Sequence, residues 1–264
     1  ASTADDTLVV SEGTAIGNLT VNKGGVEIYG TVENLILGSD AFVKVYSVGD
    51  AQLLREAFDL AEENKCARIV LTADIDLEGS EGNMWEPVNT ENTRFEELDG
   101  AGHTISNLYA DNYTGHADGA GYYYGGFFYV LQGNVKNLTI ENATVTCHRG
   151  GALAGPMDWG SIENCHVRNA DITGEQKLGG LIGFVSNSSK DVSVKGSSVE
   201  GCTISPLISS GLYQAAGLIG YLQTFDRNVL VEGCSVSDIT LGKVYEPDSK
   251  VTDRIYDLEQ YYSH

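Results

Sequence analysis

Residues 135–145 read VKNLTIENATV, and the same pattern of apolar and polar positions returns in three later stretches. The later copies are IENCHVRNADI at residues 162–172, VKGSSVEGCTI at 194–204 and VEGCSVSDITL at 231–241. In every copy, positions 1, 4, 6, 9 and 11 are apolar or small, and the others are mostly polar. Apolar residues two apart have the period of a β-strand, whereas a helix would place them three and four apart. Each copy therefore predicts two short strands.

The residue before each predicted strand indicates a tight bend. Positions 3 and 8 of the four copies hold only asparagine, glycine or aspartate: Asn137, Asn142, Asn164, Asn169, Gly196, Gly201, Gly233 and Asp238. These residue types tolerate the left-handed backbone conformation that a tight bend requires. Each copy is thus expected to form a strand, a corner and a second strand, with the chain turning and not forming hairpins.

A glycine-rich apolar run lies between the copies and predicts a third strand. These runs are GGFFYV (125–130), GGALAG (150–155), GGLIGF (179–184) and AGLIGY (216–221). Three strands per coil, with coils stacked in parallel, predict an all-β fold of the right-handed parallel β-helix (β-solenoid) type. The intervals lengthen at two corners of the coil, and loops stacked at one corner of a solenoid usually carry its binding surface.

The regions on either side of the repeats divide the chain into three predicted parts. Residues 50–64 predict one α-helix with Asp50 as N-cap, which caps the open end of the β-helix over residues 50–242. Its apolar stripe consists of Leu53, Leu54, Ala57, Phe58 and Ala61. The stretch FEELDGAGHTISNLYA (95–110) predicts a further coil with Ile105 and Leu108 inward. Residues 1–49 predict a small separate β-solenoid or sheet segment, and residues 243–264 a polar C-terminal junction.

The charge of the chain limits its partners. With 37 acidic and 16 basic side chains, the net charge is −21, which repels nucleic-acid phosphates and anionic membrane surfaces. We therefore expect no nucleic-acid partner. No apolar run approaches the roughly 20 residues needed to span a bilayer, so we expect no membrane insertion of this segment. Solubility explains the acidity most simply, and calcium ligation or a cationic partner are the alternatives.

Cysteine and histidine positions favour no metal site. The five cysteines lack CxxC spacing, and the five histidines lack any metal-binding spacing. Cys165 and Cys234 share position 4 but lie two coils, about 9.6 Å, apart, so we expect buried free thiols. Asp74, Asp76 and the nearby Glu78 could chelate calcium, the only cofactor that the sequence allows for.

The run GGLIGF followed by VKGSSVEGCTI, together with IVLTADIDLEG and FEELDGAGHTISNL, resembles the bacterial GLUG-motif β-helix proteins over residues 50–242. This resemblance implies a secreted or surface-attached bacterial protein, in which such repeats act as stalks or recognition modules. The chain departs from the motif at Phe128, where glycine is preferred, and at Ala216, which replaces the first glycine of its pair. Residues 13–45 are similar to the AIDA-type repeats of autotransporter adhesins.

The exposed candidates for ligand binding gather in one tyrosine-rich loop and one corner. The loop DNYTGHADGAGYYYGGFF (111–128) and the corner that follows contribute Tyr113, His116, Tyr122, Tyr123, Tyr124, His148 and Arg149. Aromatic rings flanked by glycine and aspartate suit contact with sugars or peptides. The alternative is that the tyrosines cover the flank of a coil.

The favoured function is a non-catalytic, adhesin-like module, secreted or on the bacterial cell surface. It would bind a glycan, or a surface protein of a host or a bacterium, through its stacked corner loops. The alternative is a polysaccharide-active lyase or glycoside hydrolase. Hydrolysis needs two carboxylates held about 5 to 9 Å apart. No such pair stands out, and we assign no catalytic residue. At position 2 the coils carry Lys136, Glu163, Lys195 and Glu232, which predicts a structural ladder of vertical ion pairs.

Overall fold

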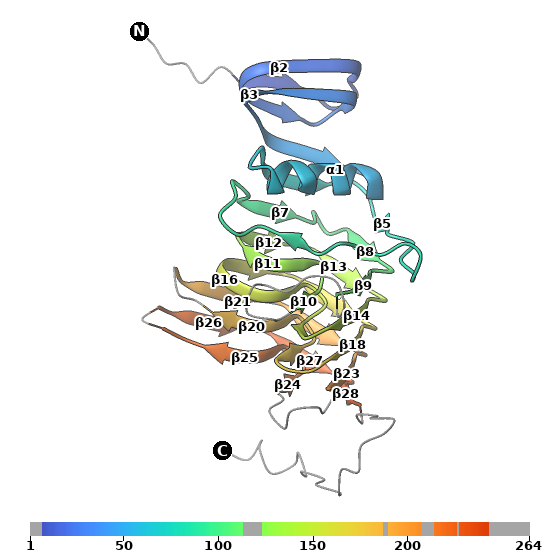
Figure 1. Cartoon of the computed structure of the whole chain (residues 1–264), viewed down its shortest axis with the longest axis vertical. Helices are drawn as coiled ribbons and strands as arrows, with labels where there is room; N and C mark the ends of the chain where they lie inside the picture. Colours follow the sequence, from blue (N-terminus) through green and yellow to red (C-terminus); the bar gives the residue numbers. More distant parts are fainter. Residues whose placement is uncertain (1–6, 113–122, 187–189, 207–213, 226, 243–264) are drawn as a thin grey trace, which may run out of the picture.

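The computed structural model describes residues 7–112, 123–186, 190–206, 214–225 and 227–242. The predicted C-terminal junction at residues 243–264 lies outside these described residues. Strands are stacked coil upon coil along the long axis, from β2 and β3 at one end to β24 and β28 at the other (Figure 1). All strand pairs between the named strands are parallel, and the predicted all-β parallel β-helix with one α-helix is confirmed.

Four parallel sheets form the faces of the coils. The long sheet contains β1 (Thr7–Val10), β2 (Ala15–Ile28), β3 (Thr31–Val48), β4 (Cys66–Leu71), β6 (Val88–Asn89), β7 (Glu97–Asp99), β11 (Phe128–Gln132), β12 (Asn134–Lys136), β16 (Ala154–Glu163), β20 (Ile182–Ser186), β21 (Val192–Lys195), β25 (Ile219–Gln223) and β26 (Val229–Glu232). The second sheet contains β5 (Ile75–Asp76), β8 (Thr104–Ser106), β13 (Thr139–Glu141), β17 (His166–Arg168), β22 (Ser198–Glu200) and β27 (Ser235–Ser237). The third contains β9 (Tyr109–Asp111), β14 (Thr144–Cys147), β18 (Asp171–Gly174), β23 (Thr203–Pro206) and β28 (Thr240–Leu241). The fourth, the short sheet, contains β10 (Tyr124–Gly125), β15 (Arg149–Gly150), β19 (Leu178–Gly179) and β24 (Ala215–Ala216).

The four sequence copies lie in register, as their pattern predicts. Position 1 of each copy pairs with position 1 of the next, from Val135 to Ile162, Val194 and Val231. All eight corner residues at positions 3 and 8 have φ between 51° and 66°, in the left-handed region. A fifth coil precedes them, because β7, β8 and β9 pair with β12, β13 and β14. Ile105 and Leu108 of that coil are buried, as predicted.

Matching slots form a shared apolar column inside the coils. At position 4, Leu138, Cys165 and Ser197 are at most 2% exposed, and Cys234 in the last described coil is half-buried. Ser197 fits among apolar neighbours because its hydroxyl bridges two backbone groups, accepting from Cys165 N at 3.1 Å and donating to Lys195 O at 2.9 Å. The cysteines are free thiols, and burial raises the pKa of Cys165 to about 12.

Helix α1 (Ala51–Glu62) begins after Asp50, whose Oδ1 accepts a hydrogen bond from Leu53 N at 2.9 Å. Four of the five predicted stripe residues are buried, and Leu53 lies at the edge of the stripe, half-buried. The Phe58 ring packs against four aromatic rings inside the first coils, with centroids 5.4 to 6.4 Å away: Trp85, Phe95, Phe127 and Phe128. Strand β3 pairs in parallel with β4, so one sheet continues past residue 50, and the predicted domain boundary there stays a prediction.

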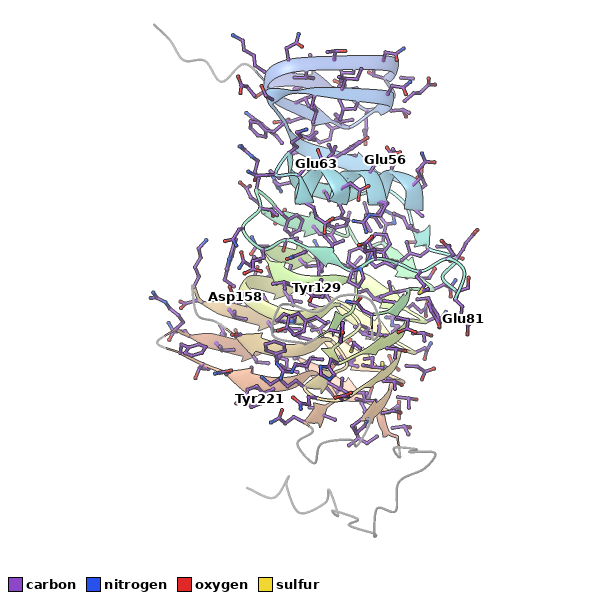
Figure 2. All side chains as sticks on the ribbon, viewed as in Figure 1. Glu56, Glu63, Glu81, Tyr129, Asp158 and Tyr221 are labelled. Carbon is purple, nitrogen blue, oxygen red and sulfur yellow. The ribbon has the colours of Figure 1, made fainter. Side chains whose placement is uncertain are left out.

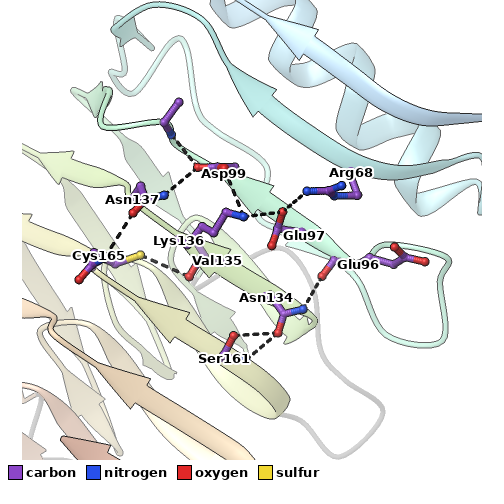
Figure 3. Close-up of polar contacts among 12 residues, drawn as sticks. Arg68, Glu96, Glu97, Asp99, Asn134, Val135, Lys136, Asn137, Ser161 and Cys165 are labelled. Carbon is purple, nitrogen blue, oxygen red and sulfur yellow. Dashed lines mark hydrogen bonds and ion pairs between the residues drawn. The ribbon is translucent and has the colours of Figure 1, made fainter. Parts of the chain in front are cut away.

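A polar network joins three successive coils of the long sheet (Figure 3). Glu97 Oε1 lies 2.6 Å from Arg68 Nη2 and 3.0 Å from Lys136 Nζ, and Lys136 Nζ lies 3.3 Å from Asp99 Oδ2. Burial raises the pKa of Glu97, but the hydrogen bonds from Arg68 and Lys136 outweigh it and leave that pKa below its ordinary value.

The predicted charge ladder is only partly formed. Its position-2 column begins one coil earlier, at Asp99, and Lys136 pairs with that residue. Among the described residues, no ion pair within 4.0 Å joins Glu163, Lys195 and Glu232, so the predicted vertical pairs are wrong for these coils. Long exposed side chains gain little from holding one geometry in water, which is the physical reason.

Lys136→Met should make unfolding less sensitive to acid. The folded-state pKa values of Glu97 and Asp99 lie below their ordinary values of 4.5 and 3.8. Their stabilisation is therefore present above those ordinary values and is lost as the pH falls through the folded-state values. We expect the variant to lose about 1 kcal/mol at pH 7 and to lose less further stability on acidification to pH 3, measured by urea unfolding at each pH. Lys195→Met, at the same slot two coils on, is the matched control, and equal pH profiles for both variants would contradict the assignment.

Candidate ligand-binding surface

Four of the seven predicted site residues are described, and they lie together. Tyr113, His116 and Tyr122 lie outside the described residues. Tyr123 O accepts hydrogen bonds from His148 N at 2.8 Å and Arg149 N at 3.1 Å, and the Tyr123 and His148 rings are 6.0 Å apart. Tyr124 pairs with Arg149 between β10 and β15. The loop and the corner, which are separate in the sequence, therefore meet at the first two strands of the short sheet.

The short sheet aligns polar and aromatic side chains from successive coils. Arg149 follows Tyr124 in the column, and since Gly150 pairs with Leu178, Lys177 comes next, just before β19. Beside this column, the long sheet aligns Pro156, Phe184 and Tyr221 in β16, β20 and β25. Tyr129 of β11 belongs to the same face, and Figure 2 shows it above Tyr221 on the front of the coils.

We call this face the aromatic surface and define it by Tyr124, Tyr129, Phe184 and Tyr221 with Arg149 and Lys177. The Tyr124 ring lies 5.1 Å from the Tyr129 ring and 5.5 Å from the Phe184 ring. Phe184 is buried beneath its neighbours, and the three tyrosines are half-buried. The exposed parts of these rings are therefore held by a packed aromatic layer.

Glycines in the long sheet bring the two columns together. A methyl group on Gly155 would lie 2.7 Å from Tyr124 Cβ, and one on Gly183 would lie 2.7 Å from the Gly150 backbone. At Gly220, the corresponding distance to the Leu178 backbone is 2.5 Å. Each glycine thus lets the short strand of the preceding coil lie directly against the long sheet. The glycine at the fifth position of the GGLIGF pattern therefore recurs because it makes this contact possible.

The sequence analysis predicted that Phe128 stands where the repeat prefers glycine, and this prediction is wrong. Register places Phe128 opposite Ala154, and Ala154 opposite Ile182, so Phe128 occupies an inward apolar slot and not the glycine slot. The residue that stands where later coils carry glycine is Tyr129. Its side chain fits because, in the described part of the chain, the short sheet begins at β10 of this same coil, so the preceding coil places no short strand beneath it. The second departure, Ala216, is located correctly, since it pairs with Gly179.

Two cations lie over the aromatic layer. Lys177 Nζ is 4.5 Å from the centroid of the Phe184 ring and 4.4 Å from that of Tyr221, and Arg149 Cζ is 5.9 Å from Phe184. Such cation–π contacts contribute about 0.5 to 1 kcal/mol each at partly exposed sites. Burial, followed by the positive charge of Arg149, lowers the pKa of Lys177. In a chain with a net charge of −21, two cations thus lie over the rings of this face.

The neighbouring corner loops are stacked by polar contacts. Glu175 N and Gln176 N donate to His148 O at 3.1 and 2.8 Å. His148 Nε2 lies 2.5 Å from Glu175 Oε2, and Arg149 Nη2 donates to Gln176 Oε1 at 3.0 Å. The corner after β18 therefore rests on the corner after β14. This stacking fixes the imidazole and the guanidinium at the edge of the aromatic surface.

The acidic residues considered for calcium have other contacts. Asp74 Oδ1 accepts from Thr104 N at 2.9 Å and lies 3.2 Å from His103 Nδ1. Asp76 Oδ1 accepts from Asn107 Nδ2 and from Glu78 N, each at 2.8 Å. The contacts with His103, Thr104 and Asn107 join the coil to the next one. Within the described ranges, no three His, Cys, Asp or Glu side chains gather as a metal ion would require, so the calcium prediction gains no support.

Comparisons with known proteins place the chain by fold. No family model matches it. Over 192 residues, 67% of this chain, the sequence is 30% identical to halomucin of Haloquadratum walsbyi, and the chain spans only 2% of the length of halomucin. The crystal structure of "a putative immunoglobulin A1 protease from Bacteroides ovatus" superimposes with a TM-score of 0.51 at 18% identity, covering 78% of this chain and 80% of that one.

The described strands and the structural similarity define the class of the molecule, a β-solenoid that has one helix among its described residues. At 18% identity, the Bacteroides structure shows a shared fold and no more. The GLUG-type and AIDA-type resemblances stay predictions, because no family model matches the chain. The described residues contain no helix of the length and apolarity that a bilayer crossing needs.

Four of the six residues of the aromatic surface were not predicted from the sequence. Tyr129, Lys177, Phe184 and Tyr221 were not among the candidates, although GGLIGF and AGLIGY both place an aromatic residue directly after their last glycine. That repeat was a usable signal. No sequence signal pointed to Lys177, because only the register of the short sheet aligns it with Arg149.

Gly183→Ala should destabilise the junction between the two columns. The added methyl group would meet the Gly150 backbone at 2.7 Å, and the backbone cannot move away without disturbing the ladder of coils. We expect a loss of about 1 to 3 kcal/mol, measured by urea unfolding. Gly82→Ala is the control, since nothing lies within 4 Å of a methyl group there. Equal unfolding midpoints for the two variants would contradict this role of the glycine.

Proposed function

We propose that this chain is a non-catalytic binding module of a secreted or cell-surface protein and that its aromatic surface binds a glycan. The observation that carries the proposal is the alignment of Tyr124, Tyr129 and Tyr221 with Arg149 and Lys177 on one face. These residues come from four successive coils. Rings and hydrogen-bond donors on one rigid face are the groups that recognise sugars, because a sugar has apolar C–H faces and a polar rim.

The solenoid repeat favours a linear polymer as the ligand. Successive coils repeat at about 4.8 Å along the axis, so the aromatic surface extends as a track and not as a closed pocket. The tyrosine rings would pack on sugar faces, while Arg149 and Lys177 would donate to hydroxyl or carboxylate oxygens. Tyr124 and Tyr129 already pack against neighbouring rings, and Lys177 lies over the Tyr221 ring, so binding would order few side chains.

The secreted or surface location rests on sequence resemblance. The repeats resemble surface-attached β-helix proteins, and the N-terminal strands resemble adhesin repeats. The similarity to halomucin over 192 residues is consistent with this setting. A polysaccharide-active enzyme is the alternative function, and the His148–Glu175 pair beside the aromatic surface is where its catalytic groups would be sought.

Replacing the half-exposed tyrosines should weaken glycan binding. A glycan array with neutral and uronate-containing polysaccharides would identify the ligand, and calorimetry would measure its affinity. We expect Tyr129→Ala and Tyr221→Ala each to weaken binding about tenfold, the typical effect of removing an aromatic contact residue. Tyr29→Ala is the matched control, since Tyr29 is exposed at the opposite end of the molecule.

Three results would contradict the proposal. These are unchanged affinity in both tyrosine variants, binding to proteins without glycan on a parallel array, and release of reducing ends or unsaturated products from the bound polysaccharide. The last result would favour the enzyme, and a Glu175→Gln variant that abolished the release would assign the catalytic group.

A further inference from the structure

A second concave site lies at the other end of the molecule, between α1 and the N-terminal strands. It is a cleft of about 260 Å³ lined by Val32, Glu33, Leu35, Tyr46, Glu56, Asp59, Leu60 and Glu63. Glu56 and Glu63 lie on the edge of α1 that faces β2 and β3 (Figure 2). The cleft is independent of the aromatic surface and takes no part in the proposed glycan binding.

The helix period explains why carboxylates gather there. Glu56, Asp59, Leu60 and Glu63 are three, four and seven residues apart, so they form a second stripe beside the one that α1 buries in the core. Strand β3 contributes Glu33 and Leu35 from the opposite wall. Four carboxylates thus line one small cleft whose remaining walls are apolar.

Only two of these four carboxylates have a cation nearby. Asp59 Oδ1 lies 2.9 Å from Arg55 Nε, and Glu63 Oε2 lies 3.1 Å from Lys65 Nζ. Among the described residues, no cation lies within 4.0 Å of Glu33 or Glu56, and Glu56 accepts only a neutral hydrogen bond from Gln52 Nε2 at 2.9 Å. The cleft therefore keeps an excess of negative charge.

A tyrosine that is almost fully buried also lines the cleft. Tyr46 is only 3% exposed, and no hydrogen bond to another described residue engages its hydroxyl. Burial and then the Glu56 charge raise its pKa to about 12, so the hydroxyl stays protonated. Among the described residues, this hydroxyl is not one of the buried polar atoms that lack a partner, so water reaches it through the cleft, and a ligand there would replace that water.

We propose that this cleft binds the cationic side chain of a partner protein, an arginine or a lysine inserted between α1 and β3. Glu33 and Glu56 would accept its N–H groups, and the Tyr46 hydroxyl would accept a further hydrogen bond. Val32, Leu35 and Leu60 would pack on its aliphatic stem, as apolar walls do around long basic side chains. A metal ion fits less well, since no three metal-ligating side chains converge in the described part of the chain.

The test uses a minimal arginine probe. Acetyl-Gly-Arg-Gly-amide would be titrated into the whole chain by NMR at low salt, with the neutral citrulline peptide as the matched probe. We expect saturable shifts at residues lining the cleft with arginine, weaker binding in 0.5 M NaCl, and none with citrulline. The lysine peptide should bind at the same residues.

Variants locate the interaction. Glu33→Gln with Glu56→Gln should weaken arginine binding about tenfold or more, the usual effect of losing charge-assisted hydrogen bonds. Glu12→Gln with Glu91→Gln removes the same charge from exposed sites elsewhere and should leave affinity unchanged. Tyr46→Phe, checked for an unchanged unfolding midpoint, should weaken binding several-fold.

Three results would overturn the proposal. These are equal binding of arginine and citrulline peptides, equal loss in the cleft and control variants, and no shift at millimolar peptide. Tighter binding of spermidine than of the arginine peptide would instead make the cleft a polyamine site. Glycan binding by the aromatic surface should be unaffected by the Glu33 and Glu56 changes, so the two proposals fail separately.

Discussion

The backbone hydrogen-bond ladder between coils is the constraint on which the rest of the structure depends. At the first corner, His166 N donates to Leu138 O, Ser198 N to Cys165 O, and Ser235 N to Ser197 O, at 2.8 to 3.0 Å. Parallel pairing of this kind requires each coil to follow the path of the coil before it. Side chains at matching slots must therefore share one environment. A polar residue fits in such a column only when its polar atoms find hydrogen-bond partners there, as the Ser197 hydroxyl does with two backbone groups.

The same ladder explains where variation is tolerated and where function can be placed. Inward slots and left-handed corners must match those of the neighbouring coils. The column of residues aligned with Tyr124 at the short sheet is half-buried and differs from coil to coil. Tyr124, Arg149 and Lys177 occupy this column. Because positions 155, 183 and 220 are glycines and carry no side chain, this column can lie against the aromatic residues of the long sheet. The proposed binding surface thus arises from a packing requirement of the repeat.

Charge is distributed unevenly over a chain whose net charge is −21. The aromatic surface gathers two cations over its rings, and the cleft beside α1 gathers four carboxylates. Between them, the Arg68–Glu97–Lys136–Asp99 network pairs its charges across coils. The two proposed sites therefore differ in the charged groups that line them and lie on different parts of the stack of coils.

The sequence by itself determined the coil. Its alternating apolar slots and its Asn, Gly and Asp corners specify local backbone conformations, which neighbouring residues decide, so the strands, the corners and the helix cap at Asp50 could be predicted. Tertiary structure alone decided which residues from different coils meet. Lys177 joins Arg149 through the register of the short sheet, Tyr129 occupies the glycine slot because its coil begins that sheet, and Tyr46 meets Glu56 through the docking of α1 on β3. These contacts join residues far apart in sequence, and loops of varied length hide their alignment until the coils are stacked.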